Sequence, residues 1–209
     1  STVTDTTPDR NTNPIKVVAG SPKSSAEVKN GDSVKIGDNT YKAVGEDSKF
    51  EFDKNGDVTL ASGTTELDKD QKVIGGGSGK EITNTGDGKV TVKANDPTGK
   101  DTVKVPANGK VKIGDAEYDA GTSGATIIAG ADSNKLTEGS VKLDKPETVS
   151  VGGKDTPVKN TGDKQIEVSA DGKVTVPAGG ELEIATAPNT AKITDVPGDT
   201  TFNIHDTAK

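Results

Sequence analysis

Residues 50–60 read Phe50-Glu51-Phe52-Asp53-Lys54-Asn55-Gly56-Asp57-Val58-Thr59-Leu60, and this stretch determines the fold class that we expect. Apolar residues alternate with polar ones on both sides of the Asn-Gly pair, which is the period of a half-buried β-strand. Asn-Gly readily adopts the positive φ angles of a tight hairpin turn. The two flanking strands are therefore expected to pair antiparallel.

The same alternation runs through most of the chain. Apolar residues two positions apart occur at Ile15-Val17, Val34-Ile36, Val90-Val92, Val103-Val105, Val111-Ile113, Ile166-Val168, Val174-Val176, Leu182-Ile184 and Phe202-Ile204. No stretch of about 12 residues has the 3.6-residue period of a helix with its start and stop signals. At most, Ser24–Lys29 and Ser133–Thr137 are expected to hold a helical turn. The sequence thus predicts an all-β protein.

The chain contains an internal repeat. Val34-Lys35-Ile36-Gly37-Asp38 with Tyr41 recurs as Val111-Lys112-Ile113-Gly114-Asp115 with Tyr118, a shift of 111 − 34 = 77. Asn84-Thr85-Gly86-Asp87 recurs as Asn160-Thr161-Gly162-Asp163, a shift of 160 − 84 = 76. A third copy begins near Ile166 and is partial, with Phe50 and Phe52 corresponding to Phe202 and Ile204. Self-similarity with a period of about 76 residues indicates an array of structural modules.

The repeat and the turn signals predict tandem small antiparallel β-sandwich modules. We expect residues 1–13 to form a flexible lead-in, 14–97 the first module, and 98–175 the second. Residues 176–209 are expected to form a partial third repeat, packed on the second module or completed by a neighbouring chain. A β-solenoid is the alternative, although the coils of a solenoid are much shorter than this repeat.

Composition excludes several classes of function. The net charge is −7, from 33 acidic and 26 basic residues, so the chain should repel nucleic acid and anionic lipid. Hydrophobic residues make up 28% and aromatic residues 2%, which predicts a thin core of Val, Ile, Leu and Ala. No apolar run approaches the roughly 20 residues that span a bilayer, so membrane insertion is not expected. Cysteine and methionine, both easily oxidised, are absent, which favours an extracellular, cell-surface or virion location.

The sequence offers little for catalysis. His205 is the only histidine, and it lies close to the end of the sequence, so neither a Ser-His-Asp system nor a zinc site is expected. We therefore expect no enzymatic activity. The glycine-rich stretch 75–79 lacks the Gly-Lys-Ser/Thr ending of a phosphate-binding loop, and we interpret it as a flexible loop.

Calcium is the one cofactor that the residues bring into consideration. Asp53, Asn55 and Asp57 place three oxygen-bearing side chains close together. Calcium requires six to eight oxygen ligands, and the full spacing of an EF-hand loop is missing. A hairpin turn accounts for these three residues without a metal, and this is the interpretation that we favour.

Two stretches resemble known families. Val158–Val168, followed by Val174–Leu182, resembles the strand and turn pattern of bacterial immunoglobulin-like repeats, which occur in surface adhesins and secreted scaffolds. Val34–Gly63 is similar to the variable outer domains of flagellins. The first resemblance covers about one module, and neither implies a functional residue in this chain.

These observations lead to one expected function and two alternatives. We expect a non-enzymatic extracellular structural protein whose repeats form a spacer, stalk or shell element of a bacterial surface protein. One alternative is a self-assembling subunit or outer domain of a filament, surface layer, flagellin or virion. The other is an adhesin module that binds a glycan or a protein. The expected partners are copies of the chain itself or other surface proteins.

Overall fold

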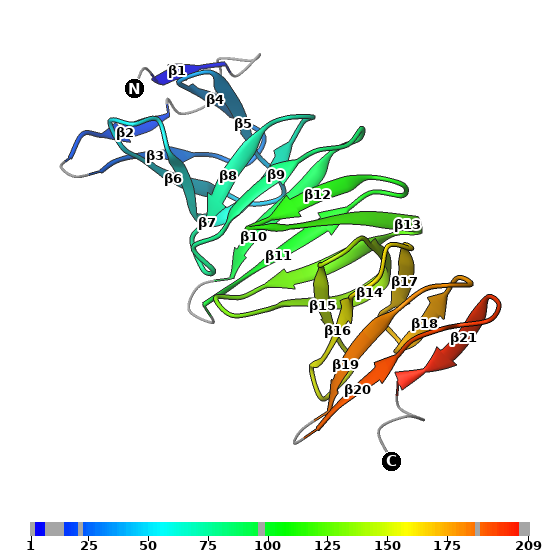
Figure 1. The fold of residues 1–209 in the computed structure, drawn as a ribbon. Helices are drawn as coiled ribbons and strands as arrows, with labels where there is room; N and C mark the ends of the chain where they lie inside the picture. The colour runs from blue at the N-terminus through cyan, green and yellow to red at the C-terminus, as the bar shows by residue number, and fades with distance from the viewer. Residues whose placement is uncertain (1–2, 7–14, 21–22, 96–98, 187–188, 205–209) are drawn as a thin grey trace. The chain divides into compact units, whose positions relative to one another are not determined.

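The computed structural model of the 209-residue chain describes residues 3–6, 15–20, 23–95, 99–186 and 189–204 (Figure 1). Every secondary-structure element that lies wholly within these ranges is a β-strand. Most strands bury every second side chain, as the sequence alternation predicts. The prediction of an all-β protein is confirmed.

The strands follow one another at short intervals along the chain. Their bounds are β1 Val3–Asp5, β2 Lys16–Val18, β3 Ser24–Val28, β4 Ser33–Ile36, β5 Asn39–Ala43, β6 Ser48–Phe52, β7 Val58–Leu67, β8 Lys72–Gly75, β9 Glu81–Asn84, β10 Val90–Asn95, β11 Lys100–Val105, β12 Lys110–Ile113, β13 Ala116–Ala129, β14 Asn134–Leu143, β15 Thr148–Val151, β16 Thr156–Asn160, β17 Ile166–Ser169, β18 Lys173–Val176, β19 Leu182–Thr186, β20 Asn189–Ile193 and β21 Thr200–Asn203.

The chain forms two compact units. Unit 1 comprises Ser1–Val103 with Ala129–Ala131, and unit 2 comprises Lys104–Ile128 with Asp132–Lys209. The division falls within strands β11 and β13. It therefore differs from the expected boundaries after residues 97 and 175.

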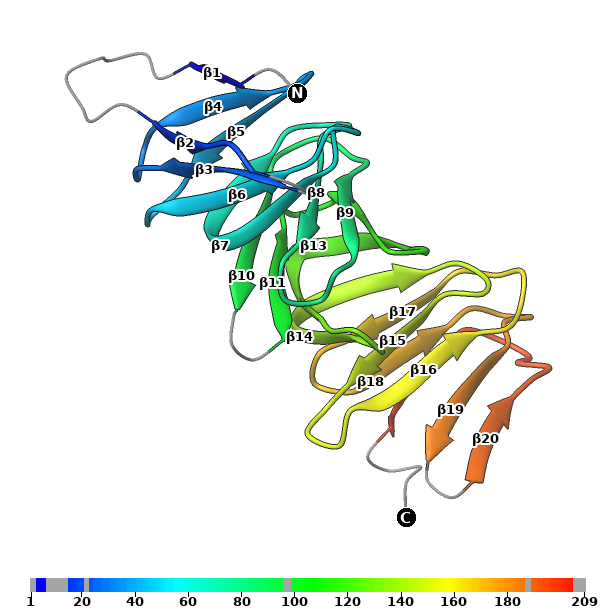
Figure 2. The same cartoon turned by 90° about the vertical axis from the view of Figure 1, so that its left-hand side faces the viewer.

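Strand β7 organises unit 1 because its two halves pair with different strands. Its first half pairs antiparallel with β6, where Leu60 lies opposite Phe50, and parallel with β8, where Thr59 lies opposite Ile74. Its second half pairs antiparallel with β10 and β5, with Leu67 opposite Val90. One series of paired strands is therefore β2-β3-β6-β7-β8-β9, and the other is β1-β4-β5-β7-β10. Figure 2 shows β2, β3 and β6 of the first series side by side.

Gly63 lies at the point where β7 changes partners. Its φ angle is +86°, a conformation that glycine adopts without steric cost. The backbone of Asp47 and Ser48 lies so close that a Cβ atom at residue 63 would overlap it. At this point the buried Ser48 hydroxyl satisfies the backbone of Thr64. It donates to the Thr64 carbonyl oxygen at 2.8 Å and accepts from the Thr64 N–H at 3.0 Å. The ladder between β6 and β7 shifts register near this point, as in a β-bulge.

Strand β14 plays the same part in unit 2. Its first half pairs parallel with β15, where Leu136 lies opposite Val151, and its second half pairs antiparallel with β17, where Leu143 lies opposite Ile166. Gly139, the repeat counterpart of Gly63, stands between the two halves with a φ angle of +77°. Two series of strands again result, β14-β15-β16-β19-β20 and β14-β17-β18-β21. We call β7 and β14 the crossover strands.

The third, partial copy has the register of the first. Val174 of β18 lies opposite Phe202 of β21, as Ala26 of β3 lies opposite Phe50 of β6. The aspartate caps also correspond. The Asp199 carboxylate accepts from the Ala178 N–H at 3.1 Å, as the carboxylate of Asp47, its counterpart two repeats earlier, accepts from the Asn30 N–H at 2.8 Å.

The core is thin and aliphatic, as the composition predicts. Three aromatic side chains, Tyr41, Phe50 and Tyr118, are at most 1% exposed, and the Tyr41 and Phe50 rings lie 5.1 Å apart. Phe52 is also buried, whereas Phe202 is only half-buried. Four of the five aromatic residues therefore belong to the core.

Other local expectations differ from the structure. Both segments expected to allow a helical turn are extended: Ser24–Val28 is β3, and Asn134 begins β14. In both segments, pairing with a neighbouring strand takes the place of a helical turn. Part of the expected lead-in is also ordered, because Val3–Asp5 pairs with β4 as strand β1. Residues 1–2 and 7–13 of that lead-in lie outside the described residues.

Replacing Gly63 with alanine should lower the free energy of unfolding more than replacing Gly56. The φ angles of the two residues are +86° and +88°, so the backbone strain of alanine, about 1 kcal/mol, is shared. Nothing lies within 4 Å of a Cβ atom added at Gly56, whereas one added at Gly63 overlaps Asp47 and Ser48. The overlap should add roughly 2 kcal/mol. Urea unfolding followed by circular dichroism measures the difference, and equal losses would contradict the crossover role of Gly63.

Candidate functional site

Two buried tyrosines tie distant strands together at corresponding positions of the two units. The Tyr41 hydroxyl donates to the Lys72 carbonyl oxygen at 2.6 Å, and the Tyr118 hydroxyl donates to the Thr148 carbonyl oxygen at 2.6 Å. Burial raises the pKa of both hydroxyls, that of Tyr118 to about 12, although the bond from Asn134 opposes the shift there. Both tyrosines therefore stay protonated at neutral pH and act as hydrogen-bond donors.

Two fully buried asparagines hold the tight turns that follow β9 and β16. The Asn84 side-chain amide donates to the carbonyl oxygens of Leu67 and Gly88, and its oxygen accepts from the Gly86 N–H, at 2.8, 2.8 and 3.0 Å. Asn160 makes the corresponding bonds to Leu143, Lys164 and Gly162 at 2.7, 2.8 and 2.9 Å. An amide that fills three bonds to buried backbone rigidifies the turn. The Asn-Thr-Gly-Asp repeat drew attention to these residues in the sequence, but it did not predict that they are buried.

A glutamine in unit 1 is replaced by a glutamate in unit 2. The Gln71 side chain accepts from the Asp68 N–H at 2.8 Å and donates to the Thr40 carbonyl oxygen at 3.1 Å. Glu147 accepts from the N–H groups of Asp144 and Glu117, both at 3.0 Å. Burial raises the pKa of the Glu147 carboxyl, and the two N–H bonds only partly offset this. A titratable group thus stands where the other copy has a neutral one.

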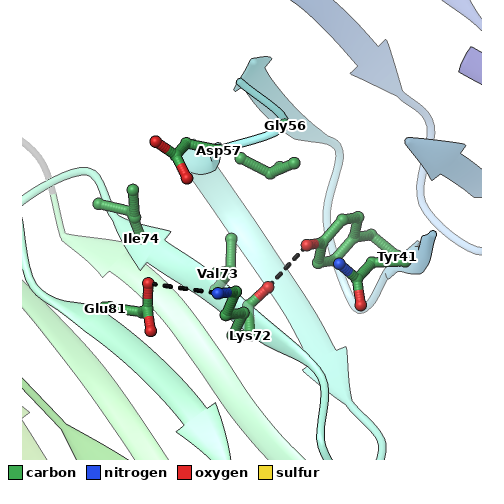
Figure 3. Close-up of a pocket in the computed structure, with 9 residues that line it drawn as sticks. Tyr41, Gly56, Asp57, Lys72, Val73, Ile74 and Glu81 are labelled. Atoms are coloured by element: carbon green, nitrogen blue, oxygen red, sulfur yellow. Dashed lines mark hydrogen bonds and ion pairs between the residues drawn. The ribbon is translucent and has the colours of Figure 1, made fainter. Parts of the chain in front are cut away.

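A small pocket lies beside the Tyr41 hydrogen bond (Figure 3). Its lining includes Tyr41, Asp57, Lys72 and Glu81, and the Lys72 ammonium lies 3.7 Å from the Glu81 carboxylate. Its volume of about 10 Å³ is room for about one water molecule. A second, open pocket of about 170 Å³ in unit 2 is lined by Lys142, Gln165, Ile166, Glu167, Thr175, Pro177 and Asp199. Both are smaller than the roughly 300 Å³ typical of small-molecule sites.

The glycine-rich turn after β8 is organised around a buried carboxylate. Asp101 is fully buried, and its two oxygens accept from the Gly77 N–H at 3.0 Å, the Ser78 N–H at 2.8 Å and the Ser78 hydroxyl at 2.5 Å. The Gly75 backbone lies so close to Asp101 that a Cβ atom there would overlap the carboxylate. The expectation of a flexible loop at residues 75–79 is wrong in this respect. Successive N–H groups do form an anion site, but a side chain of the same unit fills it.

Sequence reasoning missed Asp101 because the residue lies far along the chain from the turn it holds. The only signal was the run of three glycines, which permits a close approach by another group without naming that group. In unit 2, the corresponding turn contains Gly152 and Gly153, and the Lys135 ammonium lies 2.6 Å from the Asp155 carboxylate. Among the described residues, the turn held by a buried carboxylate is thus a feature of unit 1.

The calcium candidates lie together in the predicted turn between β6 and β7. One oxygen of Asp53 accepts from the Asn55 N–H at 2.9 Å and from the Asp57 N–H at 3.1 Å. The Asp53 carboxylate therefore caps the turn, as the hairpin interpretation requires. Among the described residues, no group of three or more His, Cys, Asp or Glu side chains is placed to hold a metal ion. The hairpin interpretation without a metal stays the one that we favour for these three residues.

The remaining sequence features are His205, the interspersed surface charges and the lack of a long apolar run. His205 lies outside the described residues. Ion pairs such as Lys29 with Asp47 join exposed side chains, and pairs of this kind contribute little to stability. The part of the chain that the structure describes contains no helix long and apolar enough to cross a membrane.

Comparison with known proteins provides no relative. The chain matches no protein-family model, no curated protein and no solved structure. Function must therefore be argued from the geometry alone.

Replacing Asp101 with asparagine should destabilise unit 1, because the single amide oxygen cannot replace both carboxylate oxygens, which accept from the Gly77 and Ser78 N–H groups. A buried N–H left without an acceptor costs roughly 1–3 kcal/mol. Asp171 is the matched control: it is exposed, and one of its oxygens accepts from the Lys173 N–H at 3.0 Å. Asparagine keeps that acceptor, so Asp171→Asn should change stability by less than about 0.5 kcal/mol. Urea unfolding and amide exchange at Gly77 and Ser78 test this, and equal effects would refute it.

Replacing Glu147 with glutamine should alter the pH dependence of stability. The pKa of Glu147 is raised in the folded state, so the folded chain binds more protons than the unfolded chain just above the ordinary glutamate pKa of 4.5. Stability from this group is present below that pH and is lost as the pH rises through the folded pKa. The glutamine keeps an acceptor for the Asp144 N–H, as Gln71 does for the Asp68 N–H, and the lost bond from the Glu117 N–H lowers its stability by an amount that does not depend on pH. The stability of the wild type relative to Glu147→Gln should therefore fall between pH 4 and 7, in urea unfolding at each pH, and a constant difference would contradict the assignment.

Proposed function

We propose that the chain is a non-enzymatic structural element, an array of tandem immunoglobulin-like β-sandwich modules. It would serve as a spacer, stalk or shell element of an extracellular bacterial surface protein. One observation carries the proposal: units 1 and 2 have the same hydrogen bonds at the same repeat positions. These bonds, made by Tyr41 and Tyr118 and by Asn84 and Asn160, all hold backbone in place.

The distribution of the repeated residues supports a mechanical role. The retained side chains lie in the interior and bind backbone of their own unit, whereas the turn after β8, which binds Asp101, differs in sequence from the corresponding turn after β15. An enzyme or a receptor needs a constellation of side chains facing a ligand. A spacer needs units that are each rigid and joined in series.

Resistance to force follows from the crossover strands. In both units, one strand changes partners along its length, and its first half has a parallel partner, β8 for β7 and β15 for β14. Sliding such a strand along its own axis breaks several backbone hydrogen bonds together. The absence of cysteine and methionine removes two targets of oxidation, which suits a protein outside the cell.

A self-assembling subunit is the second candidate, and strand β2 favours it. Val17 and Val18 of β2 are 47% and 50% exposed. Exposed apolar residues on a short strand favour association with another strand.

Stretching single molecules of residues 1–209 between two handles tests the proposal. Extension should occur in separate cooperative steps, one set for each unit. Tyr41→Phe and Tyr118→Phe each remove a buried hydrogen bond and should lower the force of different steps. Smooth extension without steps, or identical effects of the two variants on every step, would contradict an array of rigid modules.

A further inference from the structure

Strand β2 exposes apolar side chains that its position in the repeat should bury. β2 pairs antiparallel with β3, and Val17 lies opposite Ala26. Val17 is nevertheless 47% exposed, whereas Ala26 is fully buried.

The strand registers identify the counterparts of β2. Val168 of β17 lies opposite Val174 of β18, and Val174 corresponds to Ala26. Val17 therefore occupies the repeat position of Val168. The sequences agree, since residues 15–19 read Ile-Lys-Val-Val-Ala, residues 90–94 read Val-Thr-Val-Lys-Ala and residues 166–170 read Ile-Glu-Val-Ser-Ala. Strand β2 is thus the counterpart of β10 and β17.

In both of the other copies, a crossover strand covers this position. Val92 of β10 lies opposite Thr65 of β7, and Val168 of β17 lies opposite Val141 of β14. Both valines are fully buried. The same repeat position is therefore closed where a crossover strand pairs with it and half open in β2.

We propose that the edge of β2 is a docking site for a strand of the β7 type from another copy of the repeat. The occupant would be an antiparallel strand with the pattern of residues 63–67, Gly-Thr-Thr-Glu-Leu, whose central threonine lies opposite Val17. Pairing of this kind adds a strand through main-chain hydrogen bonds and selects it through alternate side chains. The inference rests on the proposed repeat array and names the contact by which one repeat joins another.

Charge distinguishes the β7 type from the β14 type. Glu66 of β7 lies opposite Thr91, and Lys142 of β14 lies opposite Glu167. The corresponding residue of β2 is Lys16. A glutamate in the docked strand would face Lys16 favourably, whereas a lysine would place like charges directly opposite each other. Strand β2 therefore prefers the glutamate of β7.

Nuclear magnetic resonance of the isotope-labelled chain with a peptide of sequence 58–67 tests the proposal. The amide signals of Lys16, Val17 and Val18 should shift, and their exchange with solvent should slow. A peptide carrying Glu66→Lys is the matched control and should bind several-fold more weakly. Equal binding of the two peptides would overturn the assigned register.

Two variants of β2 distinguish binding at a defined site from non-specific association of apolar residues. Val17→Lys places a charge at the position that Val92 and Val168 bury, so it should weaken peptide binding at least tenfold. Val18→Lys places lysine where β10 already has the exposed Lys93, so binding should persist. Equal loss in both variants would overturn the proposal.

A fusion protein tests the proposal even if the isolated peptide binds weakly. Residues 58–67 are joined ahead of Ser1 through a flexible Gly/Ser linker, which raises the effective concentration of the strand to the millimolar range. Slower amide exchange at Val17 and Val18 in the fusion supports the proposal, and unchanged exchange in both peptide and fusion overturns it. Concentration-dependent shifts of the same amides in the chain alone would mean that a second copy of this chain covers the edge, and they would overturn the proposal because β7 of that copy already pairs with β10. Force steps measured on the chain alone do not depend on any of these results, so the two proposals fail separately.

Discussion

The structure of each unit depends on one strand that belongs to two series of paired strands. A β-strand keeps its partners as long as its twist and pleat are regular, so a change of partners needs a backbone conformation outside the β region. Gly63 and Gly139 supply it with φ angles of +86° and +77°. The neighbouring backbone lies so close to both glycines that no side chain fits there. The crossover strand can therefore connect the two series without a loop.

Buried hydrogen bonds complement a core that is poor in large side chains. Aromatic residues make up only 2% of the chain, so few side chains reach across a unit. The Tyr41 and Tyr118 hydroxyls and the Asn84 and Asn160 amides instead fix the backbone of turns and neighbouring strands from inside. Such bonds contribute modestly when made but are costly to lose, because the partner is left buried without water. Selection for rigid units would thus retain them in every copy.

The copies also differ at some side chains that hold the backbone of a turn. Glu147 replaces Gln71 in the same cap, and Gly124 occupies the repeat position of Asp47, whose carboxylate holds a turn in the first copy. The Asn30 N–H holds the pKa of the Asp47 carboxyl below its ordinary value. Such exchanges change the response of each copy to pH without changing its strand pairing. An array built from these copies has a common framework and individual electrostatics.

The sequence by itself determined the all-β class, the antiparallel hairpin at residues 50–60 and the repeat, because alternation and turn residues are local properties. Only the tertiary structure decided the partners of β7, the burial of Asp101 under the glycine turn and the strand in Val3–Asp5. Each of these depends on groups distant in the chain, and a local pattern does not specify which distant group arrives. The same reason explains why Val17 resembles any strand valine in sequence, although its exposure distinguishes it from the counterparts that a crossover strand covers.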